Sequence, residues 1–107
     1  MADSYYKLVV YVPTSHADAV RDAIGKAHGG KIGDYTYCSF SSPGTGRFVP
    51  GADSKPFIGT SGRLEKVSEE RIEVSVEKNA LKDVIEAMKR VHPYEEVAFD
   101  VYECLRP

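Results

Sequence analysis

The sequence contains no tryptophan, only two cysteines and no excess of basic residues. Its 14 Lys and Arg stand against 16 Asp and Glu, and a net charge of −2 argues against a partner such as nucleic acid. No apolar run approaches the roughly 20 residues that cross a bilayer, so no membrane partner is predicted. The start MADSYYK lacks the features of a signal peptide. With Cys38 and Cys104 too far apart for a CxxC motif, this predicts a cytoplasmic protein with reduced thiols.

The chain has 107 residues, of which 42% are apolar. This length is typical of one compact domain, and such a domain buries enough surface to form a core without disulfides or metal. We therefore predict a single domain over residues 1–107.

Alternating and helical spacings of apolar residues predict six elements. Ser15 is the expected N-cap of the first helix, and Pro93 ends the second. The predicted strands cover 5–12, 34–42, 71–76 (with a start as early as 64) and 97–105, and the predicted helices cover 15–28 and 79–92. The order β-α-β-β-α-β predicts an α+β, ferredoxin-like sandwich in which two helices cover one face of a four-stranded antiparallel sheet.

The face of this sheet that no helix covers is predicted to be rich in tyrosine. Its expected residues are Tyr5, Val9, Tyr11, Tyr35, Tyr37 and Tyr102. A monomer rarely leaves such a patch exposed, so we expect a second subunit to cover it. A platform for stacked bases is the alternative, which the acidic composition disfavours.

Eight of the 15 Gly and Pro residues lie between Pro43 and Gly62, and this predicts a loop of about 20 residues after the second strand. Gly44 and Gly46 would let backbone N–H groups approach an anionic ligand, with Arg47 supplying charge. The alternative is that the glycines only form tight turns, since no complete nucleotide motif is present.

The string His92-Pro-Tyr-Glu-Glu96 ends a helix and begins a strand. An imidazole and two carboxylates are ligands for a divalent metal ion, so His92, Glu95 and Glu96 are the candidate metal site. His92 is expected in the last helical turn, where the helix dipole favours a positive charge. The simpler alternative to a metal site is a rigid turn in which the imidazole caps backbone carbonyls and the carboxylates face solvent. Convergence of Cys104 with His92 would instead create a soft-metal site.

No nucleophile and base are placed together by a motif. The adjacent carboxylates Glu69 and Glu70 lie on a strand, so they point to opposite faces and cannot act as an acid–base couple. The sequence therefore predicts that the chain is not an enzyme.

Five strings resemble the domain that is inserted into proteins of the Nif3-like (YqfO) family: 30–35 GKIGDY, 38–48 CSFSSPGTGRF, 56–59 PFIG, 69–73 EERIE and 92–97 HPYEEV. The His92-Pro-Tyr-Glu95 string also resembles a motif of the CutA family. Both resemblances imply the fold of the signal-transduction PII proteins, self-association with a trimer favoured over a dimer, and a loop after the second strand that contacts ligands or partners. The metal-binding motifs of the lobes that flank the Nif3 insert are absent, so the resemblance implies no hydrolase activity.

Composition, motifs and resemblance together favour a non-enzymatic, oligomeric binding or regulatory module. Its expected ligand is a divalent cation or a small molecule near His92, Glu95 and the segment 43–62. The alternatives are a structural or partner-binding module, and an enzyme whose metal-dependent site forms only between subunits.

Overall fold

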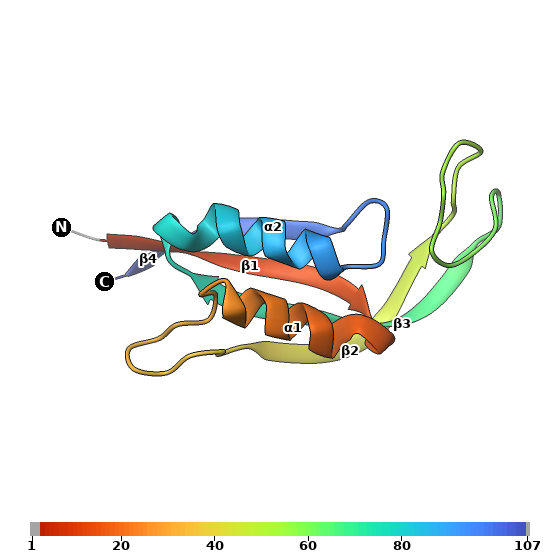
Figure 1. Cartoon of the computed structure of the whole chain (residues 1–107). Helices are drawn as coiled ribbons and strands as arrows, with labels where there is room; N and C mark the ends of the chain where they lie inside the picture. The colour runs from red at the N-terminus through yellow and green to blue at the C-terminus, as the bar shows by residue number, and fades with distance from the viewer. Residues whose placement is uncertain (1–2, 107) are drawn as a thin grey trace.

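The computed structural model describes residues 3–106, so residues 1, 2 and 107 of the predicted single domain lie outside the described part. It confirms the α+β class: two helices lie on one face of a four-stranded antiparallel sheet (Figure 1). No helix among the described residues is long and apolar enough to span a membrane. The elements are β1 (Asp3–Pro13), the 3-10 turn η1 (Thr14–His16), α1 (Ala17–Lys26), β2 (Phe40–Phe48), β3 (Glu65–Val76), the 3-10 turn η2 (Lys78–Ala80), α2 (Leu81–Val91) and β4 (Phe99–Arg106).

The sheet has the strand order β2-β3-β1-β4, and β1 pairs antiparallel with both β3 and β4. Side chains alternate along each strand, so every second residue of β1 and β3 faces the helices. These residues form the core with the apolar stripes of the two helices. Its buried members are Leu8, Val10, Val12, Ala17, Val20, Ile24, Ile72, Val74, Val76, Val84 and Met88.

The first helix begins later than the sequence predicts. Ser15 is not its N-cap; the Ser15 hydroxyl lies 2.8 Å from Nδ1 of His16 inside the turn η1, and α1 begins at Ala17. The second helix ends at Val91, as expected from the proline at position 93.

The second strand also lies further along the chain than the predicted range 34–42. Residues 31–39 form a connection in which Ile32 and Tyr35 bond to each other, and β2 begins only at Phe40. The expected loop therefore starts at residue 49 instead of 43. Proline and glycine are tolerated in β2 because it is an edge strand, where one side of the backbone needs no partner.

The open face of the sheet, which no helix covers, carries four of the six residues predicted there. The pairing of β1 with β3 and β4 places Tyr5, Val9, Tyr11 and Tyr102 on this face. The other two, Tyr35 and Tyr37, lie outside the strands, in the 31–39 connection.

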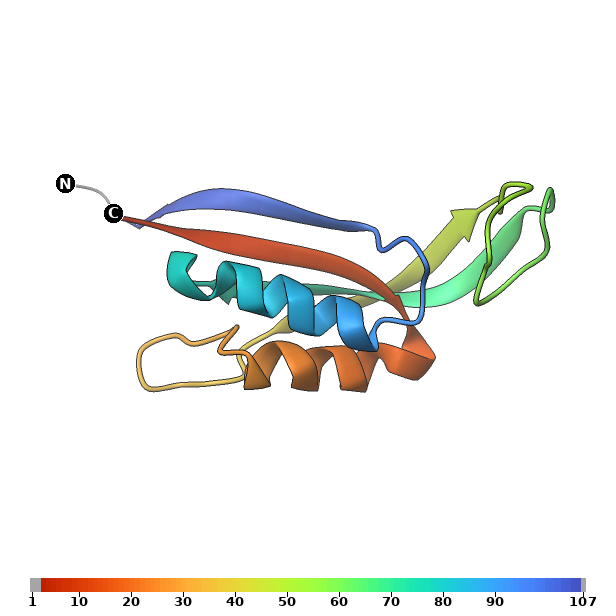
Figure 2. The same cartoon turned by 45° about the horizontal axis from the view of Figure 1, so that its top comes forward.

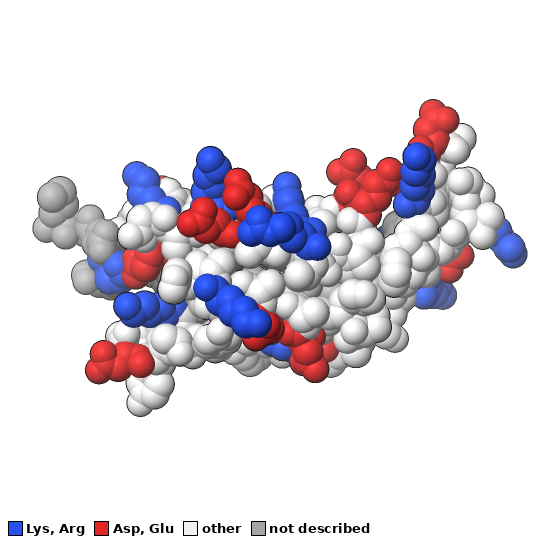
Figure 3. Space-filling view, viewed as in Figure 1, with Lys and Arg blue, Asp and Glu red and all other residues white. Residues whose placement is uncertain are grey.

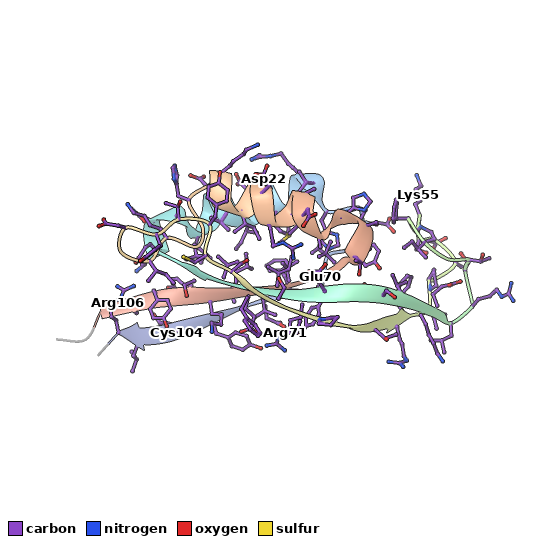
Figure 4. The ribbon with its side chains drawn as sticks, turned by 90° about the horizontal axis from the view of Figure 1, so that it is seen from below. Asp22, Lys55, Glu70, Arg71, Cys104 and Arg106 are labelled. Carbon is purple, nitrogen blue, oxygen red and sulfur yellow. The ribbon has the colours of Figure 1, made fainter. Side chains whose placement is uncertain are left out.

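Charged side chains share this open face with the tyrosines. Lys7 and Arg71 both form ion pairs with Glu73, at 3.6 and 3.4 Å. In Figure 4, Arg71 and Cys104 lie on the side of the sheet away from the helices, whereas Glu70 lies between sheet and helices. The face is thus a mixed aromatic and charged surface.

Candidate functional site

A cavity of about 380 Å³ lies where the β2–β3 hairpin, residues 49–64, meets the α2–β4 connection, residues 92–98. Figures 1 and 2 show the hairpin extending past the end of the sheet, beside the α2–β4 connection. We call this cavity the hairpin pocket. It is lined by Tyr11, Gly46, Arg47, Phe48, Val49, Pro50, Gly51, Ser54, Pro56, Phe57, Ile58, Glu69, Tyr94, Glu95, Glu96 and Ala98.

Glu69 is the buried charged group of this pocket, with only 9% of its surface exposed. One carboxylate oxygen, Oε2, accepts a hydrogen bond of 2.7 Å from the Tyr94 hydroxyl. The carboxylate lies over Gly46, where a Cβ atom would collide with it. Position 46 therefore has to be glycine for the carboxylate to occupy this place.

Tyr94 closes the pocket on the side of the α2–β4 connection. Its ring packs against Phe48 of β2, with 5.7 Å between ring centroids, and against His92 at 5.1 Å. Burial and the hydrogen bond to Glu69 raise the pKa of Tyr94, so the phenol stays protonated as the donor to the carboxylate. The ring contacts fix the position of this donor.

His92 is almost fully buried and acts as a structural group of the connection. The Tyr94 backbone N–H donates to Nδ1 at 3.1 Å, so the ring proton is on Nε2, which lies 2.7 Å from the Tyr11 carbonyl oxygen. Burial lowers the pKa of His92. The imidazole thus caps the Tyr11 carbonyl, while Glu95 and Glu96 are exposed, as in the simpler alternative of a rigid turn. The lowered pKa favours the neutral ring over the cation that the helix dipole would stabilise.

The three predicted metal ligands do not assemble within one chain. Glu95 and Glu96 are exposed, and Oε1 of Glu95 accepts a hydrogen bond of 2.9 Å from the Lys55 backbone N–H, whereas both His92 nitrogens bond internally. Among the residues that the structure describes, no three His, Cys, Asp or Glu side chains are grouped to hold a metal ion. Within the described part of one chain, these donors therefore do not form a metal site.

The three predicted anion-binding residues lie in β2, not in a loop. Gly44 pairs with Glu69, and Arg47 pairs with Lys66 on β3. Gly46 and Arg47 line the hairpin pocket, so two of these three residues are at the site, but as parts of a strand.

The suggested pairing of Cys104 with His92 does not occur. Cys104 lies opposite Tyr5 at one end of β1, while His92 bonds to Tyr11 near the other end, and six residues of strand span about 20 Å. Both cysteines are free thiols.

Sequence reasoning missed Glu69 as a site residue, although it recognised that Glu69 and Glu70 face opposite ways. Only the register of β2 on β3 reveals that Gly46 leaves room for the Glu69 carboxylate. Gly46 lies in a segment whose side chains alternate as in a strand. The high glycine and proline content of this segment predicts a loop instead, so the sequence gives no indication that Gly46 meets Glu69.

No family model matches the chain, but two other comparisons with known proteins agree on the relationship. The chain is 51% identical over 100 residues to the GTP cyclohydrolase 1 type 2 homolog of Halalkalibacterium halodurans. The matched region covers 94% of the chain and 27% of that protein. The structure of a Bacillus cereus protein related to NIF3 matches 97% of the chain and 26% of its own length, with a TM-score of 0.81 and 47% identity.

A more distant likeness concerns the fold alone. The PII-like protein CutA from Nostoc sp. PCC 7120 superposes with a TM-score of 0.64 at 14% identity, over 91% of this chain and 78% of that one. The chain spans about a quarter of the length of the curated relatives it matches. It is thus a homologue of the Nif3-like proteins over that quarter, and it has the fold of the PII and CutA proteins.

Proposed function

We propose that this chain is a non-catalytic, self-associating binding module that takes a small ligand in the hairpin pocket. The observation that supports this most directly is the buried Glu69–Tyr94 pair on the wall of a 380 Å³ cavity. Ligand sites are concave and mostly apolar, with a few fixed polar groups, and the hairpin pocket has this composition. The two free thiols fit the reducing cytoplasm as its location.

The binding part of this proposal is tested by titrating a panel of nucleotides, amines and carboxylates into ¹⁵N-labelled protein. We expect at least one class to shift the backbone amide signals of Gly46 and Ala98, which lie on different walls of the pocket. Gly33, a glycine outside the residues that line the pocket, serves as the internal reference. A panel that leaves Gly46 and Ala98 unshifted at millimolar concentration contradicts the proposal.

Self-association through the open face is the second part of the proposal. Tyr102 and Phe40 on this face are 52% and 66% exposed, and both would be covered by another copy. Light scattering at tens of micromolar should give a multiple of the 11.8 kDa chain mass, with a trimer favoured. Tyr102→Glu should return the mass to that of one chain, whereas Lys82→Glu on the exposed side of α2 should not. A wild-type monomer contradicts this part.

A partner-binding role is the second candidate, and exposed apolar side chains at one end of the sheet favour it. At this end β1 and β4 lie side by side, and Asp3 pairs with Arg106 (Figure 2). Exposed Ile32, Tyr35 and Leu105 lie near this end. Replacing the matching quarter of the halodurans relative with this chain tests the role: a folded chimaera fits it, and an insoluble one, with both parents soluble, contradicts it.

A further inference from the structure

The electrostatics of the hairpin pocket restrict which ligand fits. Of the titratable residues that line it, Glu69, Glu95 and Glu96 are acidic, and Arg47 is the basic one. Arg47 and Gly46 are neighbours in β2, so their side-chain positions point to opposite faces of the strand, and it is Gly46 that meets Glu69. Figure 3 shows acidic side chains gathered over the α2–β4 connection, beside the hairpin. The residues that line the pocket therefore carry a net negative charge, with Lys55 as a further basic residue at the rim beside Glu95.

Glu69 has no basic partner in the described part of the chain, although more than nine-tenths of its surface is buried. The Tyr94 hydroxyl occupies Oε2, and no hydrogen bond to Oε1 is formed by the described residues. No side-chain oxygen of the described residues is both buried and without a partner, so Oε1 remains accessible. A cation in the pocket could therefore pair with Oε1.

The remaining walls indicate what the cation is attached to. Tyr11, Phe48, Phe57 and Tyr94 contribute aromatic rings, and Pro50, Pro56 and Ile58 contribute apolar surface. Aromatic faces attract organic cations, whereas a hydrated metal ion gains nothing from apolar walls. The volume of about 380 Å³ is that of a small-molecule site.

We propose that the hairpin pocket binds a small organic cation, an ammonium or guanidinium group on an apolar or aromatic body, with Glu69 as its counter-ion. This inference rests on the proposed function, because it assigns a ligand class to the same pocket. The cation lies between the Glu69 carboxylate and the aromatic rings, while Tyr94 holds the carboxylate in place through its hydrogen bond. Glu95 and Glu96 at the rim attract the cation toward the pocket.

The experiment compares three ligands of one shape: 2-phenylethylamine, which is cationic, 2-phenylethanol, which is neutral, and phenylacetate, which is anionic. Binding to the full chain is measured by calorimetry and by the amide shift of Gly46. We expect the amine to bind at least 10-fold more tightly than the other two. Glu69→Gln should abolish this preference, because the amide keeps an acceptor for Tyr94 but loses the charge. Glu73→Gln, on the same face of β3 but away from the pocket, should retain it.

Gly46→Ala is the second variant, and it acts without changing any charge. Its Cβ displaces the Glu69 carboxylate, so the amine affinity should fall as in Glu69→Gln. Equal binding of all three ligands, with shifts at Gly46, overturns the cation assignment while the proposed function stands. No shift at Gly46 with any of the three overturns the cation assignment, and the wider panel described above then decides the proposed function separately. An amine preference that survives in Glu69→Gln overturns the role of Glu69.

Discussion

Glu69 and Glu70 are adjacent in β3, yet the fold treats their charges in opposite ways. Glu70 faces the helices, where Arg21 of α1 lies 2.5 Å from its carboxylate and also bonds to Ser41 and Asp18. Glu69 faces the hairpin pocket and has only a neutral phenol as its partner. The first carboxylate joins a helix to the sheet, and the second lines a cavity. Opposite faces of one strand thus separate an ion-paired carboxylate from the one that we propose as a counter-ion for a ligand.

Removing Arg21 should have the largest effect on stability. Arg21→Met leaves the half-buried Glu70 and Ser41 without their partner, so the free energy of unfolding should fall by about 1–3 kcal/mol. Urea denaturation at pH 7 measures the change. Arg90→Met, on an exposed part of α2, is the control and should change stability by less than about 0.5 kcal/mol. A similar value for Arg21→Met would mean that the ion pair contributes nothing.

Removing the charge of Glu69 should have a smaller effect on the free energy of unfolding. Glu69→Gln takes a buried charge without a basic partner out of the pocket, so the unfolding free energy should stay within about 1 kcal/mol of the wild type or rise. The same urea experiment applies, with Glu70→Gln as the matched variant that destabilises. A loss for Glu69→Gln as large as that for Glu70→Gln would remove the distinction between the two carboxylates.

The pH dependence of stability should reveal His92 beside this pocket. Burial lowers the pKa of His92 in the folded chain, so the unfolded chain takes up the proton first as the pH falls. The neutral imidazole therefore makes its full contribution to the free energy of unfolding above the ordinary pKa of about 6.5. It should be lost as the pH falls below 6.5 toward the folded pKa. Denaturation at pH 7.5 and 5.5 should show this decrease, and His92→Gln should reduce it, while the exposed His28→Gln should not. An unchanged profile in His92→Gln contradicts the assignment.

Divalent cations should have the smallest effect. Glu95 and Glu96 are exposed, and no third ligand lies with them among the described residues of one chain. We therefore expect 1 mM Zn²⁺ to raise the free energy of unfolding by less than about 1 kcal/mol, and only in the assembled protein. The double variant Glu95→Ala, Glu96→Ala should abolish this binding. His92→Gln should preserve it, because both imidazole nitrogens are already bonded. Equal loss in His92→Gln would show that the imidazole is a ligand after all.

The sequence predicted the class of fold well because the signals for it are local. The alternation of Leu8, Val10 and Val12 and the helical spacing of Val84 and Met88 directly report which side is buried. The strand after α1 was misplaced because its residues, from Pro43 to Gly46, have low strand propensity. Pairing with β3 overrides that propensity, and such pairing is a property of the folded sheet.

The site was predicted only in part. The sequence predicts a ligand near His92, Glu95 and the segment 43–62, and in the structure Gly46, Arg47, Glu95 and Glu96 line the hairpin pocket. A capping role for His92 is among the alternatives that the sequence offers, but its partners are not predictable, because the backbone groups of Tyr11 and Tyr94 carry no sequence signal. Glu69 was missed for the same reason: its burial depends on a glycine from another strand.

The edge position of β2 has a consequence for how the protein behaves at high concentration. An exposed edge strand offers a row of free backbone groups on which other chains can add strands and begin to aggregate. In β2, Pro43 lacks the N–H group that such an addition needs, and the neighbouring glycine offers no side chain to pack against a newcomer. The proline and glycine residues that predict a loop in the sequence therefore protect this edge of the sheet against the addition of further strands.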